Sequence, residues 1–88
     1  MKVNPELLNI IFKIDSLDDL NHLFEDIFTP AELYDIDLRW RLLKDLHKGM
    51  AQRKIAEKYG ISLCKITRGS RILKKKDSTV LKILNAQQ

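Results

Sequence analysis

The sequence predicts an all-α protein of about six short helices with a helix-turn-helix, and three observations predict this class. Apolar residues recur every three or four positions through most of the chain, and no useful stretch alternates between apolar and polar residues. Only three glycines and two prolines interrupt the 88 residues, mostly between the periodic segments. We therefore expect a single domain with N-terminal helices over about 4–48, the helix-turn-helix over about 51–73 and a C-terminal helix over about 77–86.

The N-terminal half contains three predicted helices. Apolar residues over 5–13 indicate a short, largely buried helix, and Ser16 offers an N-cap for the second, with Asp19 three residues on. The segment Thr29-Pro30-Ala31-Glu32 starts the third, because threonine caps, proline suits the first helical position and glutamate the third. Gly49 stops this helix. On this third helix we expect the following side chains to point mostly inward: Leu33, Ile36, Trp40, Leu42, Leu43 and Leu46.

Two short helices with a tight turn follow Gly49. The segment Gln52–Lys58 makes about two helical turns, and Tyr59-Gly60-Ile61 then breaks the helix. Ser62 caps a second helix over Leu63–Leu73. This arrangement predicts a helix-turn-helix.

Particular side chains fit the packing of that motif. Ala56 is small where the second helix crosses the first, and Gly60, four residues later, suits a left-handed turn conformation. We expect Ile55, Ile61 and Ile66 to form the core between the two helices. The outer face of the second helix then carries side chains able to meet phosphates and base edges, namely Lys65, Thr67, Arg68 and Arg71.

Charge is distributed unevenly along the chain. Residues 1–37 hold nine acids against two lysines, a net charge of −7, whereas residues 38–88 hold fourteen lysines and arginines against three acids, a net charge of +11. A basic half joined to an acidic half predicts a polyanionic partner for one end of the chain. A solvated basic surface, or an adaptor that binds an acidic protein, is the alternative.

Composition excludes other classes. His22, His47 and Cys64 are scattered singly, so we expect neither a metal site nor an intrachain disulfide. The acids of the N-terminal half do not pair with a histidine or lysine at a spacing that suggests an enzyme. No stretch resembles a signal sequence or a membrane span, and one thiol fits a reducing compartment, so we expect a cytoplasmic protein. The small core favours a homodimer.

Gln52-Arg53, Ile55 and the run Ile66-Thr67-Arg68-Gly69-Ser70 resemble the Trp repressor family. The resemblance extends upstream to Thr29-Pro30-x-Glu32, Arg39 and Gly49, and so covers roughly residues 17–76. It implies six helices per subunit and two chains that interlock through their N-terminal helices. It also implies a repressor that binds double-stranded operator DNA with L-tryptophan as corepressor and controls tryptophan biosynthesis or transport genes.

The resemblance further implies a tryptophan site. Arg39 and Arg68 would stack on the two faces of the indole, since guanidinium planes stack on aromatic rings. The ligand carboxylate would meet Thr29 and Arg68. The backbone carbonyls of Asp26 and Phe28 would accept hydrogen bonds from the ammonium group.

Other positions are similar to the family site or depart from it. Gly69 would leave room for the ring, but Ile72 stands where the family has a serine that helps hold the ammonium. Lys65 replaces a shorter threonine, and the turn after Gly49 is one residue shorter. The shorter turn and Arg71 resemble the corresponding features of the YerC/YecD-type Trp-repressor-like proteins. The alternative to a tryptophan-activated repressor is therefore a regulator with a different ligand or none.

The resemblance also implies the contacts with DNA. Arg53 matches an arginine that reaches a guanine edge, and Leu63, Cys64 and Thr67 begin the helix that approaches the bases. Lys74 opens a run of three lysines that either attract phosphates or only solubilise a helix end. The expected phosphate contacts are Gln52, Lys54, Ser70 and Lys74, with Lys65 and Arg71 on the same face.

Overall fold

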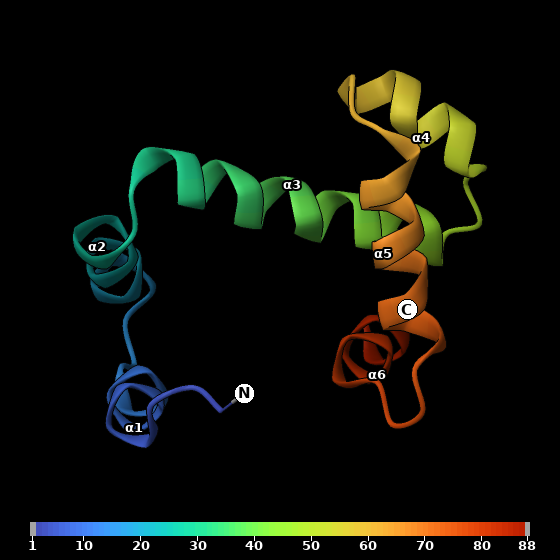
Figure 1. Ribbon diagram of the computed structural model, residues 1–88. Helices are drawn as coiled ribbons and strands as arrows, with labels where there is room; N and C mark the ends of the chain where they lie inside the picture. Colours follow the sequence, from blue (N-terminus) through green and yellow to red (C-terminus); the bar gives the residue numbers. More distant parts are fainter. Residues whose placement is uncertain (1, 88) are drawn as a thin grey trace. The chain divides into compact units, whose positions relative to one another are not determined.

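The computed structural model describes residues 2–87 and is all-helical (Figure 1). This confirms the predicted fold class, and no strand occurs among the described residues. The six helices are α1 (Pro5–Lys13), α2 (Leu17–Ile27), α3 (Pro30–His47), α4 (Gln52–Tyr59), α5 (Leu63–Lys74) and α6 (Thr79–Ala86).

Side-chain caps fix where the first three helices begin. The Asn4 side chain accepts from backbone N–H groups at the start of α1, and Ser16 Oγ accepts from the Asp19 N–H at 3.3 Å at the start of α2. At α3, Thr29 Oγ1 accepts from the Glu32 N–H at 3.2 Å while the Glu32 carboxylate accepts from the Thr29 N–H at 2.9 Å. This reciprocal capping box confirms the helix start predicted from the sequence.

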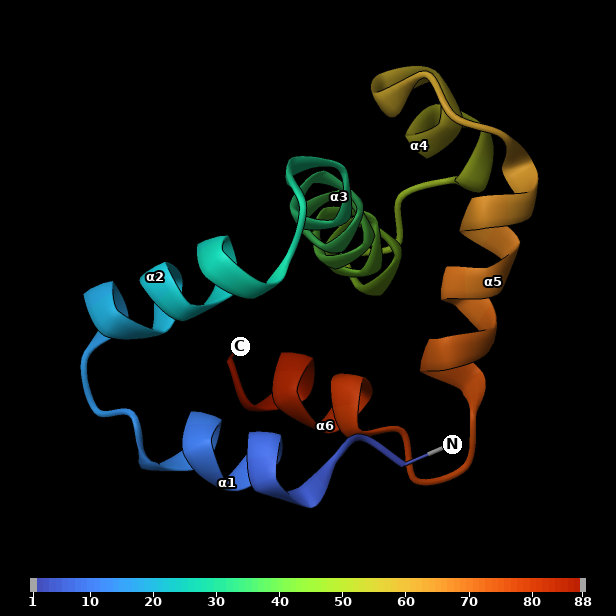
Figure 2. The same cartoon turned by 60° about the vertical axis from the view of Figure 1, so that its left-hand side comes forward.

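The chain divides into an N-terminal unit, Met1–Asp35, and a C-terminal unit, Ile36–Gln88. In the N-terminal unit, α1 and α2 run alongside one another (Figures 1 and 2), and neither helix contains a buried residue. Phe12 is 89% exposed and Leu17 is 85% exposed. The expectation that residues 5–13 are largely buried is therefore wrong for a single chain, because α1 and α2 alone cannot cover their apolar faces.

The C-terminal unit contains the buried core. Leu42 and Leu43 of α3 pack with Ile55 of α4 and Ile66 of α5, and the two isoleucines are fully buried. Ile61, in the turn between α4 and α5, packs against this cluster as expected. The end of α3 therefore supports both helices of the helix-turn-helix.

Gly69 permits the close approach of α5 to α3. A Cβ atom at this position would lie 2.5 Å from Leu42 Cδ1 and 3.2 Å from Leu46 Cδ1. The absence of a side chain thus allows the middle of α5 to pack against the leucines of α3. Sequence reasoning had assigned Gly69 only to ligand binding.

Some details of α3 differ from the sequence expectation. Leu42 and Leu43 are buried, but Ile36 is 39% exposed and Trp40 is 36% exposed, so neither points into the core of this chain. Leu38, which was not among the expected core residues, is buried. Helix α3 therefore carries more apolar side chains than a single chain buries.

The last helix begins with its own cap and contacts the end of α3. Ser78 is buried, and its Oγ accepts from the Leu81 N–H at 3.1 Å, so α6 begins at Thr79, two residues after the expected start. The ring of His47, at the end of α3, lies 2.8 Å from Asn85 of α6 through Nε2. No helix in residues 2–87 is both long enough and apolar enough to cross a membrane.

Candidate nucleic-acid interface

The turn between α4 and α5 has the geometry of a helix-turn-helix. Gly60 ends α4 with φ 63° and ψ 39°, and the Ile61 N–H donates to the Ala56 carbonyl at 3.1 Å. A Cβ atom on Gly60 would meet nothing within 4 Å, so the left-handed backbone and not space favours glycine here. The predicted turn is confirmed at this residue.

The start of α5 differs in one detail from the prediction. Ser62 occupies the N-cap position in extended conformation, but its side chain makes no capping hydrogen bond. The N–H groups of the first turn of α5 are therefore left to solvent or to an acceptor from outside the chain.

A shallow hollow follows the exposed face of α5. It has a volume of about 300 Å³ and is lined by Leu63, Cys64, Thr67, Arg68 and Arg71. All five side chains are exposed, and they come from successive turns of a single helix. The face thus presents apolar and polar side chains together with two guanidinium groups.

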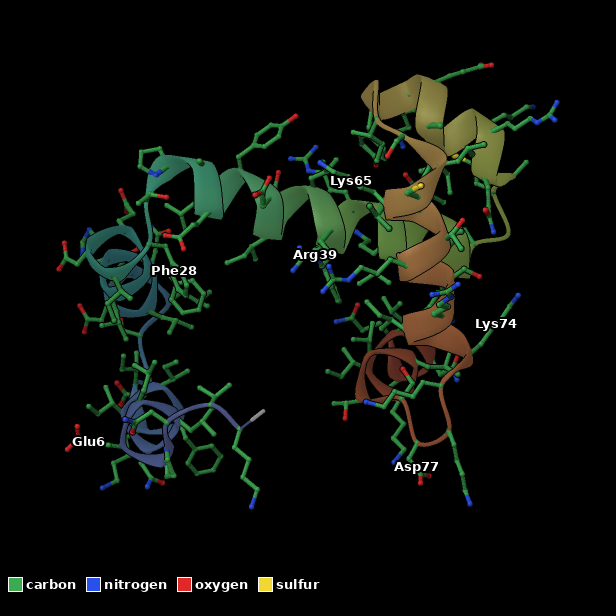
Figure 3. The ribbon with its side chains drawn as sticks, viewed as in Figure 1. Glu6, Phe28, Arg39, Lys65, Lys74 and Asp77 are labelled. Atoms are coloured by element: carbon green, nitrogen blue, oxygen red, sulfur yellow. The ribbon has the colours of Figure 1, made fainter. Side chains whose placement is uncertain are left out.

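The other predicted DNA contacts are also at the surface. On α4 these are Gln52, Arg53 and Lys54, all of them exposed. Lys65 and Lys74 are exposed near the two ends of α5 (Figure 3), whereas Ser70 is half-buried. The structure brings these residues together on two adjacent helices that meet at the Gly60 turn.

Few negative charges oppose this surface. Residues 51–88 contain ten lysines and arginines but only Glu57 and Asp77 as acids, and α5 itself contains no acid. Among the described residues, Lys58 is the one cation of this segment that forms an ion pair. The others are available to an external polyanion.

Lys58 belongs to a small polar group at the junction of α3 and α4, which we call the Asp45 cluster (Asp45, Lys58 and Tyr59). Asp45 is only 7% exposed, and its Oδ2 accepts from the Tyr59 hydroxyl at 2.5 Å and from Lys58 Nζ at 3.0 Å. The Lys58 ammonium also lies 5.1 Å from the centroid of the Tyr59 ring. The cluster therefore ties the last turn of α4 to α3.

Electrostatics keep the Asp45 carboxyl ionised. Burial raises its pKa, but the hydrogen bonds from Tyr59 and Lys58 and the positive charges of Lys58 and Lys48 outweigh burial, so the pKa lies below its ordinary value. The hydrogen bond to Asp45 raises the pKa of Lys58, and burial together with the same carboxylate raises that of Tyr59. At neutral pH the cluster consists of an anion, a cation and a neutral phenol.

Comparison with known proteins identifies the family. The family model described as "Trp repressor protein" matches residues 4–88. A "Trp operon repressor homolog" of Xylella fastidiosa is 40% identical over 65 residues, which cover 73% of this chain and 71% of the relative. The chain belongs to the Trp repressor family.

Two further relatives support this membership. A Trp operon repressor homolog of Chlamydia trachomatis serovar L2 is 38% identical over 71 residues, covering 80% of this chain and 76% of the relative. One from Vibrio campbellii is 37% identical over 67 residues, covering 73% and 67%. No solved structure gives a significant match. Membership of the Trp repressor family makes the chain a DNA-binding regulator.

The residues that the resemblance assigns to tryptophan are divided between the two units. Arg39 on α3 (Figure 3) and Arg68 on α5 are both exposed and belong to the C-terminal unit. Gly69 and Ile72 also lie in that unit, where Ile72 packs against the core cluster. The N-terminal unit holds the remaining three, Asp26, Phe28 and Thr29.

Sequence reasoning did not find the Asp45 cluster. Its signal is an acid on the apolar face of α3, because Leu38, Leu42 and Asp45 follow at the four- and three-residue spacing of one helix face. An acid at such a position must pair when it is buried. The pairing partners, Lys58 and Tyr59, are thirteen and fourteen residues away, so helix periodicity alone does not identify them.

The lowered pKa of Asp45 predicts how stability depends on pH. A group whose pKa is depressed on folding stabilises the folded state above the unfolded pKa of about 3.9, and this contribution is lost as the pH falls through the folded pKa. Asp45→Asn should therefore lower the free energy of unfolding by about 1–3 kcal/mol at pH 7 and by progressively less below about pH 4. Urea unfolding followed by circular dichroism, from pH 7 to the lowest pH at which both proteins fold, measures the difference.

Asp37→Asn provides the control for this prediction. Asp37 pairs with Arg41 at 3.0 Å, but both side chains are more than half exposed. Loss of this ion pair should therefore change the free energy of unfolding by less than about 0.5 kcal/mol, both at pH 7 and at acid pH. A difference for Asp45→Asn that stays constant or grows toward acid would contradict the assignment of a depressed pKa.

Proposed function

We propose that this protein is a transcriptional repressor that binds double-stranded operator DNA with α5 as the reading helix. The observation that carries the proposal is the left-handed Gly60 turn, which joins α4 to a helix whose exposed face holds cations and no acid. Family membership supports the same assignment. A DNA-binding repressor of this kind acts in the cytoplasm.

Different residues serve affinity and sequence recognition in this proposal. Arg53 reaches a guanine edge from α4, while Leu63, Cys64 and Thr67 on the exposed face of α5 approach the bases. The cations of α5 and of the lysine run contact phosphates, which position the protein without reading sequence. The proposed phosphate contacts are Gln52, Lys54, Lys65, Ser70, Arg71 and Lys74, followed by Lys75 and Lys76.

We further propose that the working form is a homodimer built through the N-terminal helices. No residue of α1 or α2 is buried in the single chain, and Phe12 and Leu17 are almost fully exposed. Apolar side chains of this size gain about 1.5–3 kcal/mol each when they are removed from water. A second copy covers such faces without any other partner, and it gives the DNA site two-fold symmetry.

L-Tryptophan is the proposed corepressor. Arg39 and Arg68 belong to separate helices of one unit, and both guanidinium groups are exposed and suited to stacking on an indole. Thr29 and the carbonyls of Asp26 and Phe28 are the polar contacts that the family resemblance implies. The regulated genes are then those of tryptophan biosynthesis or transport.

A regulator with another ligand or none is the second candidate, and two observations favour it. Ile72 packs against the core cluster where a serine would hold the ligand ammonium. The space beside Gly69 is taken by Leu42 and Leu46. Both features weaken the proposed ligand site, because Ile72 provides no hydrogen bond and little space is left beside Gly69.

Arg53→Ala tests sequence recognition. It should weaken binding to a duplex selected from a random library by about 1–3 kcal/mol while changing binding to random DNA much less. Lys75→Ala, the control, should weaken both duplexes alike, because it removes only a phosphate contact. Gel shifts at several salt concentrations measure both, and the unaltered dimer should give a log–log slope of roughly −5 to −9. An unchanged ratio of selected to random binding in Arg53→Ala would refute its role, and the absence of any salt-sensitive shift would favour a protein-binding adaptor.

Sedimentation velocity at low micromolar concentration tests the dimer. The unaltered protein should sediment at about twice the mass of one chain, and Phe12→Asp should abolish that species by placing a charge on an apolar face. Asn9→Asp on the same helix adds a charge at an exposed polar position and should leave the dimer intact. A folded species with the mass of a single chain in the unaltered protein would show that the proposal is wrong.

Calorimetric titration tests tryptophan as the corepressor. Tryptophan binding should be detected, and the selected DNA should tighten it by the same factor by which tryptophan tightens DNA binding. The coupling free energy between the two ligands should be about 1–3 kcal/mol. Arg39→Ala should weaken ligand binding, and Ile72→Ser should strengthen it by returning a hydrogen bond to the ammonium. No heat of binding up to millimolar tryptophan, with or without DNA, would place the protein with the second candidate.

A further inference from the structure

The Asp45 cluster holds α4 at the point where the direction of α5 is set. Lys58 and Tyr59 are the last two residues of α4, and Gly60 follows them directly with its left-handed backbone. Both side chains reach the same carboxylate oxygen, Asp45 Oδ2, on α3. A change in the position of α4 on α3 therefore moves the turn that leads into the reading helix.

The same part of α3 also holds α5. Leu42 and Leu46, which flank Asp45 along α3, are the side chains that Gly69 of α5 approaches most closely. The two helices of the helix-turn-helix are thus attached to neighbouring positions on α3. Helix α4 adds polar contacts with Asp45 to the packing of Ile55, whereas α5 is attached by close apolar packing. Their arrangement is fixed when both attachments are made.

The polar contacts of Asp45 contribute mainly to the orientation of α4 and add little to the burial of apolar surface. The Tyr59 side chain packs against the core cluster, so its ring already contributes to the core, and its hydroxyl adds a directional bond to Asp45. A buried carboxylate carries a desolvation cost, and burial is the largest influence that opposes ionisation of Asp45. An apolar residue at position 45 would avoid this cost but would not fix the rotation of α4.

We infer that Asp45 is a positioning residue that acts through the Tyr59 hydroxyl and Lys58 to hold the helix-turn-helix in its operator-reading arrangement without any ligand. The inference rests on the proposed DNA-binding function. In this inference, Lys58 pairs with Asp45 and does not contact a DNA phosphate. Contacts with bases depend on this arrangement, whereas attraction to phosphates depends mainly on the number of cations.

Tyr59→Phe provides the sharpest test because it removes one hydroxyl and keeps the ring and every charge. Without tryptophan, its affinity for a duplex selected from a random library on the unaltered protein should fall roughly three- to ten-fold, since fewer molecules hold the competent arrangement. Its affinity for a scrambled duplex of the same length and composition should stay within about two-fold. Fluorescence anisotropy at one salt concentration, at a temperature where circular dichroism shows every variant folded, measures both.

Tyr34→Phe is the matched control. Tyr34 is 63% exposed on α3, so loss of its hydroxyl should leave both affinities unchanged. Asp45→Asn should reproduce the selective loss, and the double variant with Tyr59→Phe should lose no more than the more affected single variant, because the two groups act through one bond. If Asp45→Asn does not fold, Tyr59→Phe carries the test alone.

The outcomes separate the inference from the function on which it rests. An unchanged ratio of selected to scrambled affinity in Tyr59→Phe, or an equal loss on both duplexes, would overturn the positioning role while leaving DNA binding intact. Failure of the unaltered protein to enrich any duplex would overturn the proposed function and the inference together.

Discussion

The packing of α5 against the end of α3 depends on the absence of a side chain at Gly69. Leu42 and Leu46 occupy the space where a Cβ atom would lie, and this proximity lets Leu42 and Leu43 bury Ile66 completely. Ile55 of α4 enters the same cluster, so a few apolar residues on two turns of α3 support the whole helix-turn-helix. The exposed face of α5 is displayed because its opposite face is fixed in this way.

The sequence predicted the features that local chemistry determines. The Thr29–Glu32 capping box and the left-handed Gly60 are specified by residues within four positions of one another, and both are present. The buried partners of Asp45 were not predicted, because they depend on how α4 packs on α3. The exposure of Trp40 was also missed, since periodicity marks an apolar face without telling which molecule covers it.

The division of charge and apolar surface along the chain has a physical consequence. The acidic N-terminal unit leaves large apolar side chains such as Phe12 exposed, whereas the basic C-terminal unit buries a compact core and exposes its cations. In the proposed dimer, association through the apolar faces of α1 and α2 covers these side chains and leaves the cations of the C-terminal unit available for DNA. In a dimer of this kind, one end of the chain provides assembly and the other recognition.

The two attachments of the helix-turn-helix to α3 bear on how a corepressor can act. A ligand changes DNA affinity only by as much as it prefers the competent arrangement over the others. Where Asp45 and the Gly69 contact already favour that arrangement, little population is left for the ligand to shift. Ile72, packed into the core in place of a hydrogen-bonding serine, reduces the contribution of the ligand site as well. Both features would give a regulator whose DNA affinity is set largely by its own contacts and adjusted modestly by tryptophan.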